Sequence, residues 1–291
     1  MTVDRPRFPA LLDATEKASA SHQSAFFWST GWQLGLLAAA AGTALIPEGW
    51  LGNLGPIVTL VLFLGALALQ AGGVAPRAER RWYDARAAAE SIKTASWEFA
   101  VGGEAFRLDD GTAEARYHDV LKRVLANVKS LDVGAAGTKN ASVTPSMKAL
   151  RAKDRAERAA VYLSGRVEDQ VDWYSSKADD NKRLARRFGI AVIAVEAVAV
   201  LVGLLRVSGS LGPDYLGPLA ACAAGIVGWM QAKKYSNLAQ AYAVTSHEVS
   251  LVPVTLDPSH SEESWAQAVH DAEAAFSREH TMWQARRQGP V

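Results

Sequence analysis

The chain has 291 residues, of which 49% are apolar and 21% are charged, and its formal net charge is +1. This composition excludes a disordered chain, a collagen-like chain and a disulfide-rich miniprotein, and the balanced charge argues against a nucleic-acid partner. The charges are unevenly distributed, because residues 18–47, 49–76 and 215–232 contain no Asp, Glu, Lys or Arg and residues 188–205 contain only Glu196.

Four apolar segments, at residues 26–46, 54–74, 188–207 and 215–230, have the character of membrane spans. A bilayer core of about 30 Å needs roughly 20 apolar helical residues, and only the fourth segment is clearly shorter. A soluble core helix usually keeps a polar stripe, which residues 34–46 and 56–69 lack. We therefore predict four transmembrane helices, the first of them a retained anchor, rather than a soluble protein with buried core helices.

Short connections rich in turn-forming residues join these segments in pairs. Residues 47–53 and 208–214 are such connections, so each pair is expected to form an antiparallel helical hairpin. Basic residues crowd the opposite ends of both hairpins, whereas the turn ends have only Arg206. The positive-inside rule then predicts cytoplasmic N- and C-termini, a cytoplasmic central region and outward-facing turns.

The polar regions between and after the hairpins have helical signals. Residues 78–101 should extend the second span into the cytoplasm until Gly102 and Gly103 end the helix, and residues 113–131 form an amphipathic pattern. Thr144 and Pro145 predict a helix start, and Gly165 predicts a break or bend. The fourth span should continue to residue 249 without interruption.

A capping box at residues 259–262 predicts the start of a final helix. Its apolar stripe should pack on other cytoplasmic helices, and consists of Trp265, Val269, Ala272, Phe276 and Trp283. The predicted fold is all-α: two transmembrane helical hairpins whose long helices extend into a cytoplasmic helical bundle. The predicted organisation is an N-terminal unit at residues 1–131, a linker at 132–144 and a C-terminal unit at 145–291.

No constellation of catalytic, cofactor-binding or metal-ligating residues is expected. Residues 134–139 have the wrong spacing for a phosphate-binding loop, and the six histidines are scattered. The single cysteine, Cys222, is expected to be a buried apolar residue. The chain is therefore not expected to be an enzyme or to need a cofactor.

Glu196 is the one acidic residue deep inside an apolar segment. A carboxylate in the middle of a bilayer costs at least a few kcal/mol unless it is protonated, paired or hydrated. It is therefore a candidate either for lining a cation-selective pore or for holding helices together in an assembly.

Glycine and alanine at four-residue spacing give some apolar helices a face for close packing. Such packing serves either a hairpin or a homo-oligomer, and the sequence leaves both open. The positions in these registers are Gly31 and Gly35; Gly65, Leu69 and Gly73; and Gly217, Ala221 and Gly225.

A polar motif runs directly into the second hairpin and contains Arg166, Gln170, Trp173, Tyr174, Lys177, Ala178 and Asn181. With this motif the chain resembles the first subtype of the SLATT family, the SMODS- and SLOG-associating two-transmembrane effector domains. Glu279, His280 and Trp283 resemble the tail of the same subtype. The first half, with Arg81-Trp82-Tyr83 and Ser96-Trp97-Glu98 after its hairpin, is similar to the third subtype.

The resemblance implies a prokaryotic inner-membrane protein that serves as an effector of conflict and defence systems. It also implies pore formation, coupling to a separately encoded nucleotide-based sensor, and no catalytic residues. The expected partners are the lipid bilayer, further copies of the same chain and such a sensor. The leading prediction is a pore-forming or membrane-disrupting effector, and the alternative is a non-catalytic membrane scaffold whose cytoplasmic helices bind partner proteins.

Overall fold

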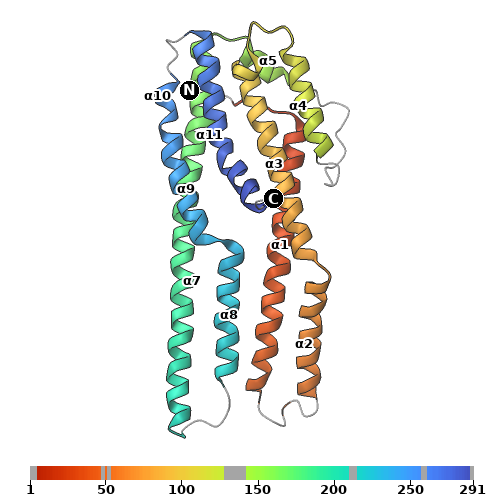
Figure 1. Ribbon diagram of the computed structural model, residues 1–291, viewed down its shortest axis with the longest axis vertical. Coiled ribbons are helices and arrows are strands. Elements are labelled where there is room, and N and C mark those ends of the chain that lie inside the picture. Colours follow the sequence, from red (N-terminus) through yellow and green to blue (C-terminus); the bar gives the residue numbers. More distant parts are fainter. Residues whose placement is uncertain are drawn as a thin grey trace. The chain divides into compact units, whose positions relative to one another are not determined.

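The computed structural model describes residues 5–46, 50, 54–127, 142–209, 215–256 and 261–288 (Figure 1). About 88% of the chain is helical, and the described residues include no strand, which confirms the all-α prediction. The predicted linker at residues 132–144 lies almost entirely outside the described residues. The α-helices are α1 (Ala10–Gly42), α2 (Leu54–Ala71), α3 (Val74–Val101), α4 (Ala113–Asn127), α5 (Pro145–Arg151), α6 (Arg155–Tyr162), α7 (Asp169–Val207), α8 (Leu216–Lys233), α9 (Tyr235–Ser250), α10 (Val252–Thr255) and α11 (Glu262–Gln288).

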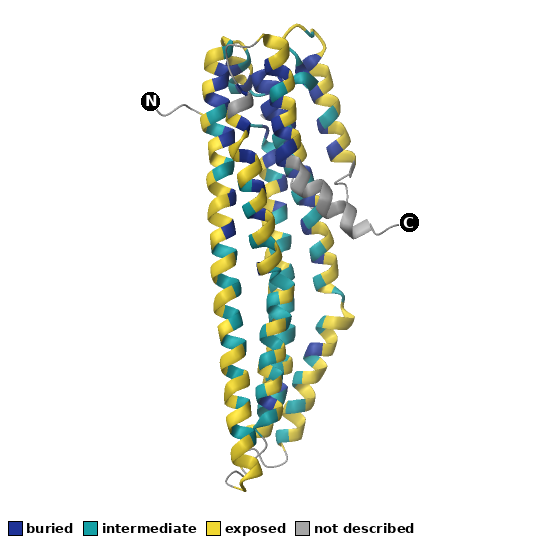
Figure 2. Ribbon diagram, turned by 60° about the vertical axis from the view of Figure 1, so that its left-hand side comes forward, coloured by how far each residue is buried: buried dark blue, intermediate teal, exposed yellow. Residues whose placement is uncertain are grey.

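The helices form two compact units, and each unit draws on both halves of the sequence. The head unit comprises Met1–Ser21, Arg81–Ala178 and Gln240–Val291, and the hairpin unit comprises His22–Arg80 and Asp179–Ala239. Buried side chains are frequent in the head unit and sparse in the hairpin unit (Figure 2). The polar and apolar parts of the sequence thus correspond to two differently packed bodies.

In each hairpin the first helix is continuous and the second is interrupted. α1 and α7 run through 33 and 39 residues. The second span was predicted to continue as one helix, but the helix breaks at Gly72–Gly73, where Gly73 has φ +59°. The fourth span breaks in the same way at Lys234, with φ +55°. Both predictions of an unbroken helix were wrong, because a left-handed residue interrupts the chain where its apolar segment meets a polar one.

Two helical stretches of the described chain are long and apolar enough to cross a membrane: Leu54–Val101 and Arg155–Val207. The most apolar part of the second has no buried residue, so side chains such as Ile193 and Leu204 are exposed on α7. α1 and α8 are less apolar, because α1 includes Gln33 and two tryptophans and α8 ends in Gln231 and Lys233. Cys222, expected to be buried, is exposed on α8.

Polar side chains inside the hairpin unit are paired between helices. Gln33 of α1 donates to Gln70 of α2, and the hydroxyl groups of Thr43 and Thr59 lie 2.7 Å apart. Where no water competes, such interhelical hydrogen bonds hold apolar helices together. α1 and the 3₁₀ turn that follows it, Thr43–Leu45, are therefore joined to α2 at two points.

The two hairpins contact each other through α1 and α8. Trp229 of α8 packs edge-on against Phe27 at a centroid distance of 6.0 Å, and the Lys233 ammonium lies 3.3 Å from the Phe27 ring centroid. Cation–π contacts of this kind keep a lysine compatible with an apolar helix surface.

Several predicted helix ends are confirmed in the head unit. α3 ends at Val101, followed by Gly102 with φ +77°, and Thr144 caps α5 by accepting a hydrogen bond from the Met147 amide at 3.2 Å. Residue 259 of the predicted capping box lies outside the described residues. The cap in the structure is Ser261, whose hydroxyl accepts from the Ser264 amide at 3.2 Å.

The core of the head unit lies on one face of α3 and the facing stripe of α11. Ala85, Ile92 and Ala100 of α3 are completely buried. Their spacing of seven or eight residues puts them on one side of a helix. The predicted stripe of α11 is buried at four of its five positions, and the fifth, Trp283, has no described side chain.

Candidate functional site

A π-helical turn, Leu163–Glu168, joins α6 to α7 and positions Arg166. The break predicted near Gly165 is instead this wider turn, through which the helix continues. A Cβ atom on Gly165 would lie 3.2 Å from the Trp97 ring, so glycine allows the close approach, and Arg5 donates from Nε to the Gly165 carbonyl at 2.8 Å. Single π-helical turns of this kind occur frequently at functional sites.

Arg166 forms a buried, bidentate ion pair with Glu273 of α11. Its Nε lies 2.9 Å from Oε1 and its Nη2 lies 2.8 Å from Oε2, and the two side chains are 1% and 0% exposed. The Tyr162 hydroxyl donates to the same carboxylate at 2.9 Å and the Thr94 hydroxyl at 2.8 Å. One carboxylate therefore ties together α3, the α6–α7 junction and α11, and we call these four residues the Glu273 cluster.

Electrostatics fix the protonation states in the Glu273 cluster. Burial alone would lower the pKa of Arg166, but the Glu273 carboxylate outweighs burial and raises it. Burial, reinforced by Glu273, raises the pKa of Tyr162 well above its usual range. The guanidinium also lies 4.9 Å from the Phe276 ring centroid. The Arg166 guanidinium is therefore charged, and a neutral tyrosine lies beside it.

A second carboxylate, Glu98, lies one helical turn beyond Thr94 on α3. His270 of α11 contacts it, with Nδ1 at 3.2 Å from Oε1, while Oε2 is buried without a hydrogen-bond partner among the described residues. Burial raises the pKa of Glu98, His270 lowers it, and Glu273 adds to the increase. Nη1 of Arg166 is the other buried polar atom without a described partner.

Two further arginines donate hydrogen bonds to backbone carbonyls at the end of α3. Arg151 donates to three backbone carbonyls at the end of α3 and in the turn after it, each at 2.7 Å. Burial, with Arg158 nearby, lowers the pKa of Arg151 to about 10. Arg158 pairs with Glu262 at 2.6 Å and also donates to the Val101 carbonyl, to which Trp265 donates at 2.9 Å. Cations at this end also offset the negative pole of the α3 dipole.

The remaining motif residues extend along α7. Tyr174 and Ala178 lie at i+8 and i+12 from Arg166 and are buried, and Trp173 and Tyr174 contact Tyr242 of α9 at 5.4 and 5.8 Å. Gln170 and Asn181 are half-buried and Lys177 is exposed. Residues of the motif therefore take part in two contacts: the Glu273 cluster and an aromatic contact between α7 and α9.

Sequence reasoning missed the residues that surround Arg166. The side chains of Glu279, His280 and Trp283 lie outside the described residues, so their predicted role stays a prediction. Glu273 could have been found, because it lies four residues after Val269 and three before Phe276 and thus interrupts an apolar stripe with a charge. Thr94, on a distant helix, had no comparable signal, and Glu98 was named only as part of the Ser96-Trp97-Glu98 resemblance.

Glu196 lies on α7 in the hairpin unit, and its side chain is exposed. Apolar residues of the same helix that flank it, including Ile193 and Val200, are exposed as well. No described residue pairs with its carboxylate. The structure thus places this acid on an open apolar surface, and its role as a pore or assembly residue stays a prediction.

The small-residue registers have mixed surroundings. A Cβ on Gly31 would lie 3.4 Å from the Trp229 ring, and one on Gly65 would lie 3.4 Å from Leu36 Cδ1, so these two glycines adjoin neighbouring helices. Ala221 is half-buried. Three positions have no atom within 4 Å of such a Cβ, and these are Gly35, Gly217 and Gly225.

The register between Gly65 and Gly73 does not form a continuous small-residue face. Its middle position is a leucine, Leu69, and Gly73 belongs to the break between α2 and α3. The spacing of Gly65 and Gly73 therefore reflects one packing position and one backbone turn.

The chemistry available in the head unit is that of a fixed charge network. Glu273 accepts four hydrogen bonds, so its lone pairs are engaged and it is not free to act as a base. The described residues include no group of His, Cys, Asp and Glu arranged to hold a metal ion. The arrangement holds α3, the α6–α7 junction and α11 together.

Comparison with known proteins gives two family matches. The model of SMODS and SLOG-associating 2TM effector domain 3 matches residues 9–159, and that of SMODS and SLOG-associating 2TM effector domain 1 matches residues 162–283. No curated protein and no solved structure matches the chain. The boundary between the two matches falls in the second half of α6, just before the π-helical turn that positions Arg166.

Proposed function

Because the chain belongs to the SLATT family, as a third-subtype unit followed by a first-subtype unit, we propose that it is a pore-forming or membrane-disrupting effector of a prokaryotic conflict or defence system. SLATT domains are membrane-associated effectors linked to such systems. The observation that carries the proposal is the apolar part of α7, which has no buried residue and is interrupted by one exposed acid, Glu196.

The exposed apolar surface supports insertion of the hairpin unit into a bilayer. Water-soluble monomers rarely expose contiguous apolar patches of more than a few hundred Å². In the proposed topology α1 and α8 cross the inner membrane beside the two more apolar helices, which gives four spans. Interhelical pairs such as Thr43 with Thr59 support this arrangement, because they satisfy the polar groups of α1 and α2 without water.

The basic residues support a cytoplasmic position for the head unit and both termini. They gather where the apolar segments of α1, α2, α7 and α8 meet polar sequence, as the positive-inside rule requires. A head unit in the cytoplasm would be accessible to a separately encoded sensor, which we propose as the source of the trigger.

We assign Glu196 to a water-filled path or to a contact between copies of the chain. An exposed carboxylate facing lipid costs several kcal/mol, and a homo-oligomer that encloses Glu196 removes this cost. The proposal assigns no catalysis and no cofactor to the chain.

Ion flux from liposomes tests the proposal. Purified protein reconstituted in vesicles should release an entrapped cation when the head unit is triggered, and Glu196→Gln should change the selectivity or the rate of release. Glu248→Gln, which removes an acid on α9 outside the apolar segments, is the matched control and should leave flux unchanged.

Vesicles that stay tight under every trigger would contradict the effector function. Tight vesicles together with stable recovery of a partner protein would instead support a non-catalytic membrane scaffold. Unchanged flux with weakened oligomers in Glu196→Gln would assign this residue to assembly alone.

A further inference from the structure

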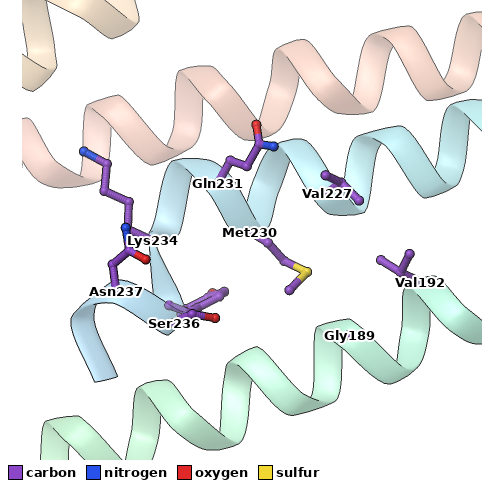
Figure 3. Close-up of a pocket in the computed structure, with 9 residues that line it drawn as sticks. Gly189, Val192, Val227, Met230, Gln231, Lys234, Ser236 and Asn237 are labelled. Carbon is purple, nitrogen blue, oxygen red and sulfur yellow. The ribbon is translucent and has the colours of Figure 1, made fainter. Parts of the chain in front are cut away.

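A groove in the hairpin unit lies where α8 breaks into α9, alongside α7. It has a volume of about 530 Å³, within the usual range of roughly 300–1,000 Å³ for small-molecule sites. Its walls come from α7, α8 and the first turn of α9, and the lining residues include Gly189, Val192, Val227, Met230 and Lys234. Figure 3 shows Met230 pointing from α8 toward α7 and Val192 pointing back across the gap.

One end of the groove is apolar and the other is polar. Val192, Val227 and Met230 belong to the apolar segments of α7 and α8, whereas Ser236 and Asn237 follow the helix break. The break itself is Lys234, which is left-handed at φ +55° and lines the groove, while its side chain runs away from α7 (Figure 3). The change from hydrocarbon to polar groups along one groove matches an amphiphilic occupant.

Two basic residues of α7 precede the groove along the helix. Lys182 and Arg186 lie seven and three residues before Gly189, so on a helix they follow the same face as this groove-lining glycine, and both are exposed. The backbone amides in the first turn of α9 add to the attraction for an anion, because they lack partners within their own helix. No acidic residue lines the groove.

The surroundings of the groove are those of a membrane–water interface. The ring of Tyr235 stacks on Phe188 at 5.6 Å, and the Lys233 ammonium lies over aromatic rings of α1 and α8. Aromatic and basic residues gather in this way at the headgroup level of a bilayer. Basic pockets between transmembrane helices on the cytoplasmic side bind the headgroups of anionic lipids.

We propose that this groove binds an anionic phospholipid, with an acyl chain along Val192, Val227 and Met230 and the phosphate at the Lys234 end. The inference rests on the membrane insertion assumed in the proposed function but not on ion conduction. In this proposal the break between α8 and α9 presents polar groups to the lipid headgroup, beside the apolar part of the groove.

A steric variant tests the groove without altering any charge. A Cβ on Gly189 meets no atom within 4 Å, so Gly189→Leu can fold and fills the groove. Gly217→Leu is the matched control, because its Cβ also meets no atom within 4 Å and it lies in the same unit but outside the groove. Phosphatidylglycerol is titrated into the purified full chain in detergent, and bound lipid is counted by native mass spectrometry.

We expect Gly189→Leu to weaken phosphatidylglycerol binding by about tenfold or more, and Gly217→Leu to leave it within about twofold. A charge pair completes the test. Arg186→Gln removes an exposed basic residue from the groove face of α7 and should weaken binding about fivefold, whereas Arg80→Gln, at the polar end of the first hairpin, should not.

Three results would overturn the proposal: unchanged binding in Gly189→Leu, equal binding of phosphatidylcholine, or equal loss in Arg186→Gln and Arg80→Gln. Inorganic phosphate is added as a competitor, and displacement of the lipid by millimolar phosphate would indicate a free-anion site instead. Lipid binding without ion flux would leave this site intact and refute only the proposed function. Flux without selective lipid binding would do the reverse.

Discussion

Replacing Glu273 with glutamine should release α11 from the rest of the head unit. The substitution keeps the volume of the side chain but puts an NH₂ group where the carboxylate accepts hydrogen bonds, so at least one of Arg166, Tyr162 and Thr94 loses its acceptor. It also leaves the Arg166 guanidinium, 1% exposed, without its counter-charge. Removal of one partner from a buried ion pair costs about 3–5 kcal/mol.

Hydrogen exchange along α11 measures this loss directly. A reduction of about 3–5 kcal/mol in the free energy of local opening corresponds to a rise of at least about 100-fold in the exchange rate of amides over residues 262–276. Glu263→Gln provides the matched control on the same helix, because its carboxylate is 78% exposed and 3.5 Å from Arg107 Nη1. This control should change exchange by less than about threefold.

A double-mutant cycle distinguishes a charge effect from a packing effect. Arg166→Met removes the charge that Glu273→Gln leaves behind, so the double variant should be more stable than the sum of the two single losses predicts, by about 2–3 kcal/mol. Additive losses, or an acceleration of less than about tenfold in Glu273→Gln, would refute the view that this ion pair holds α11 in place.

Three further predictions concern the head unit and α7. The raised pKa of Glu98 means that the folded chain binds this proton more tightly than the unfolded chain does, so Glu98 favours folding below pH 4.5 and its contribution falls as pH rises toward the raised value. Glu98→Gln removes that fall, so it should raise the melting temperature above that of the wild-type chain by more at pH 7 than at pH 4. A smaller gain at pH 7 would contradict this. Gly102→Ala should destabilise the head unit by about 1–3 kcal/mol in thermal unfolding, because φ is +77° and a Cβ would lie 2.9 Å from Arg158 Nη1; an unchanged melting temperature would show that the turn relaxes. Gly189→Ala, with open space around its Cβ, should instead stabilise α7 by up to about 1 kcal/mol in the same assay, and a loss would mean that the groove needs a glycine.

Local features of this fold could be predicted where one residue type decides them. Gly102 ends α3 because it accepts a left-handed conformation, and Thr144 starts α5 because its hydroxyl caps the first turn. The stripe from Trp265 to Phe276 was visible because helical periodicity and burial coincide on α11.

Other features could not be predicted because they depend on distant residues. No glycine marks the left-handed break at Lys234 in the sequence, and hydropathy alone indicates a continuous helix there. The wide turn around Gly165 depends on the Trp97 ring, which packs against it from α3. Arg166 was identified through its motif, but its partner Glu273 is 107 residues away, a pairing that local periodicity does not specify.

The distance between Arg166 and Glu273 along the chain also sets an order of events during translation. Arg166 leaves the ribosome 107 residues before Glu273, an interval of about 5–20 s at usual rates of synthesis. Residues 188–230, the second hairpin, are made within this interval. The guanidinium therefore stays hydrated until the hairpin has been synthesised, and a nascent chain that stops before residue 273 lacks the acid that closes the head unit.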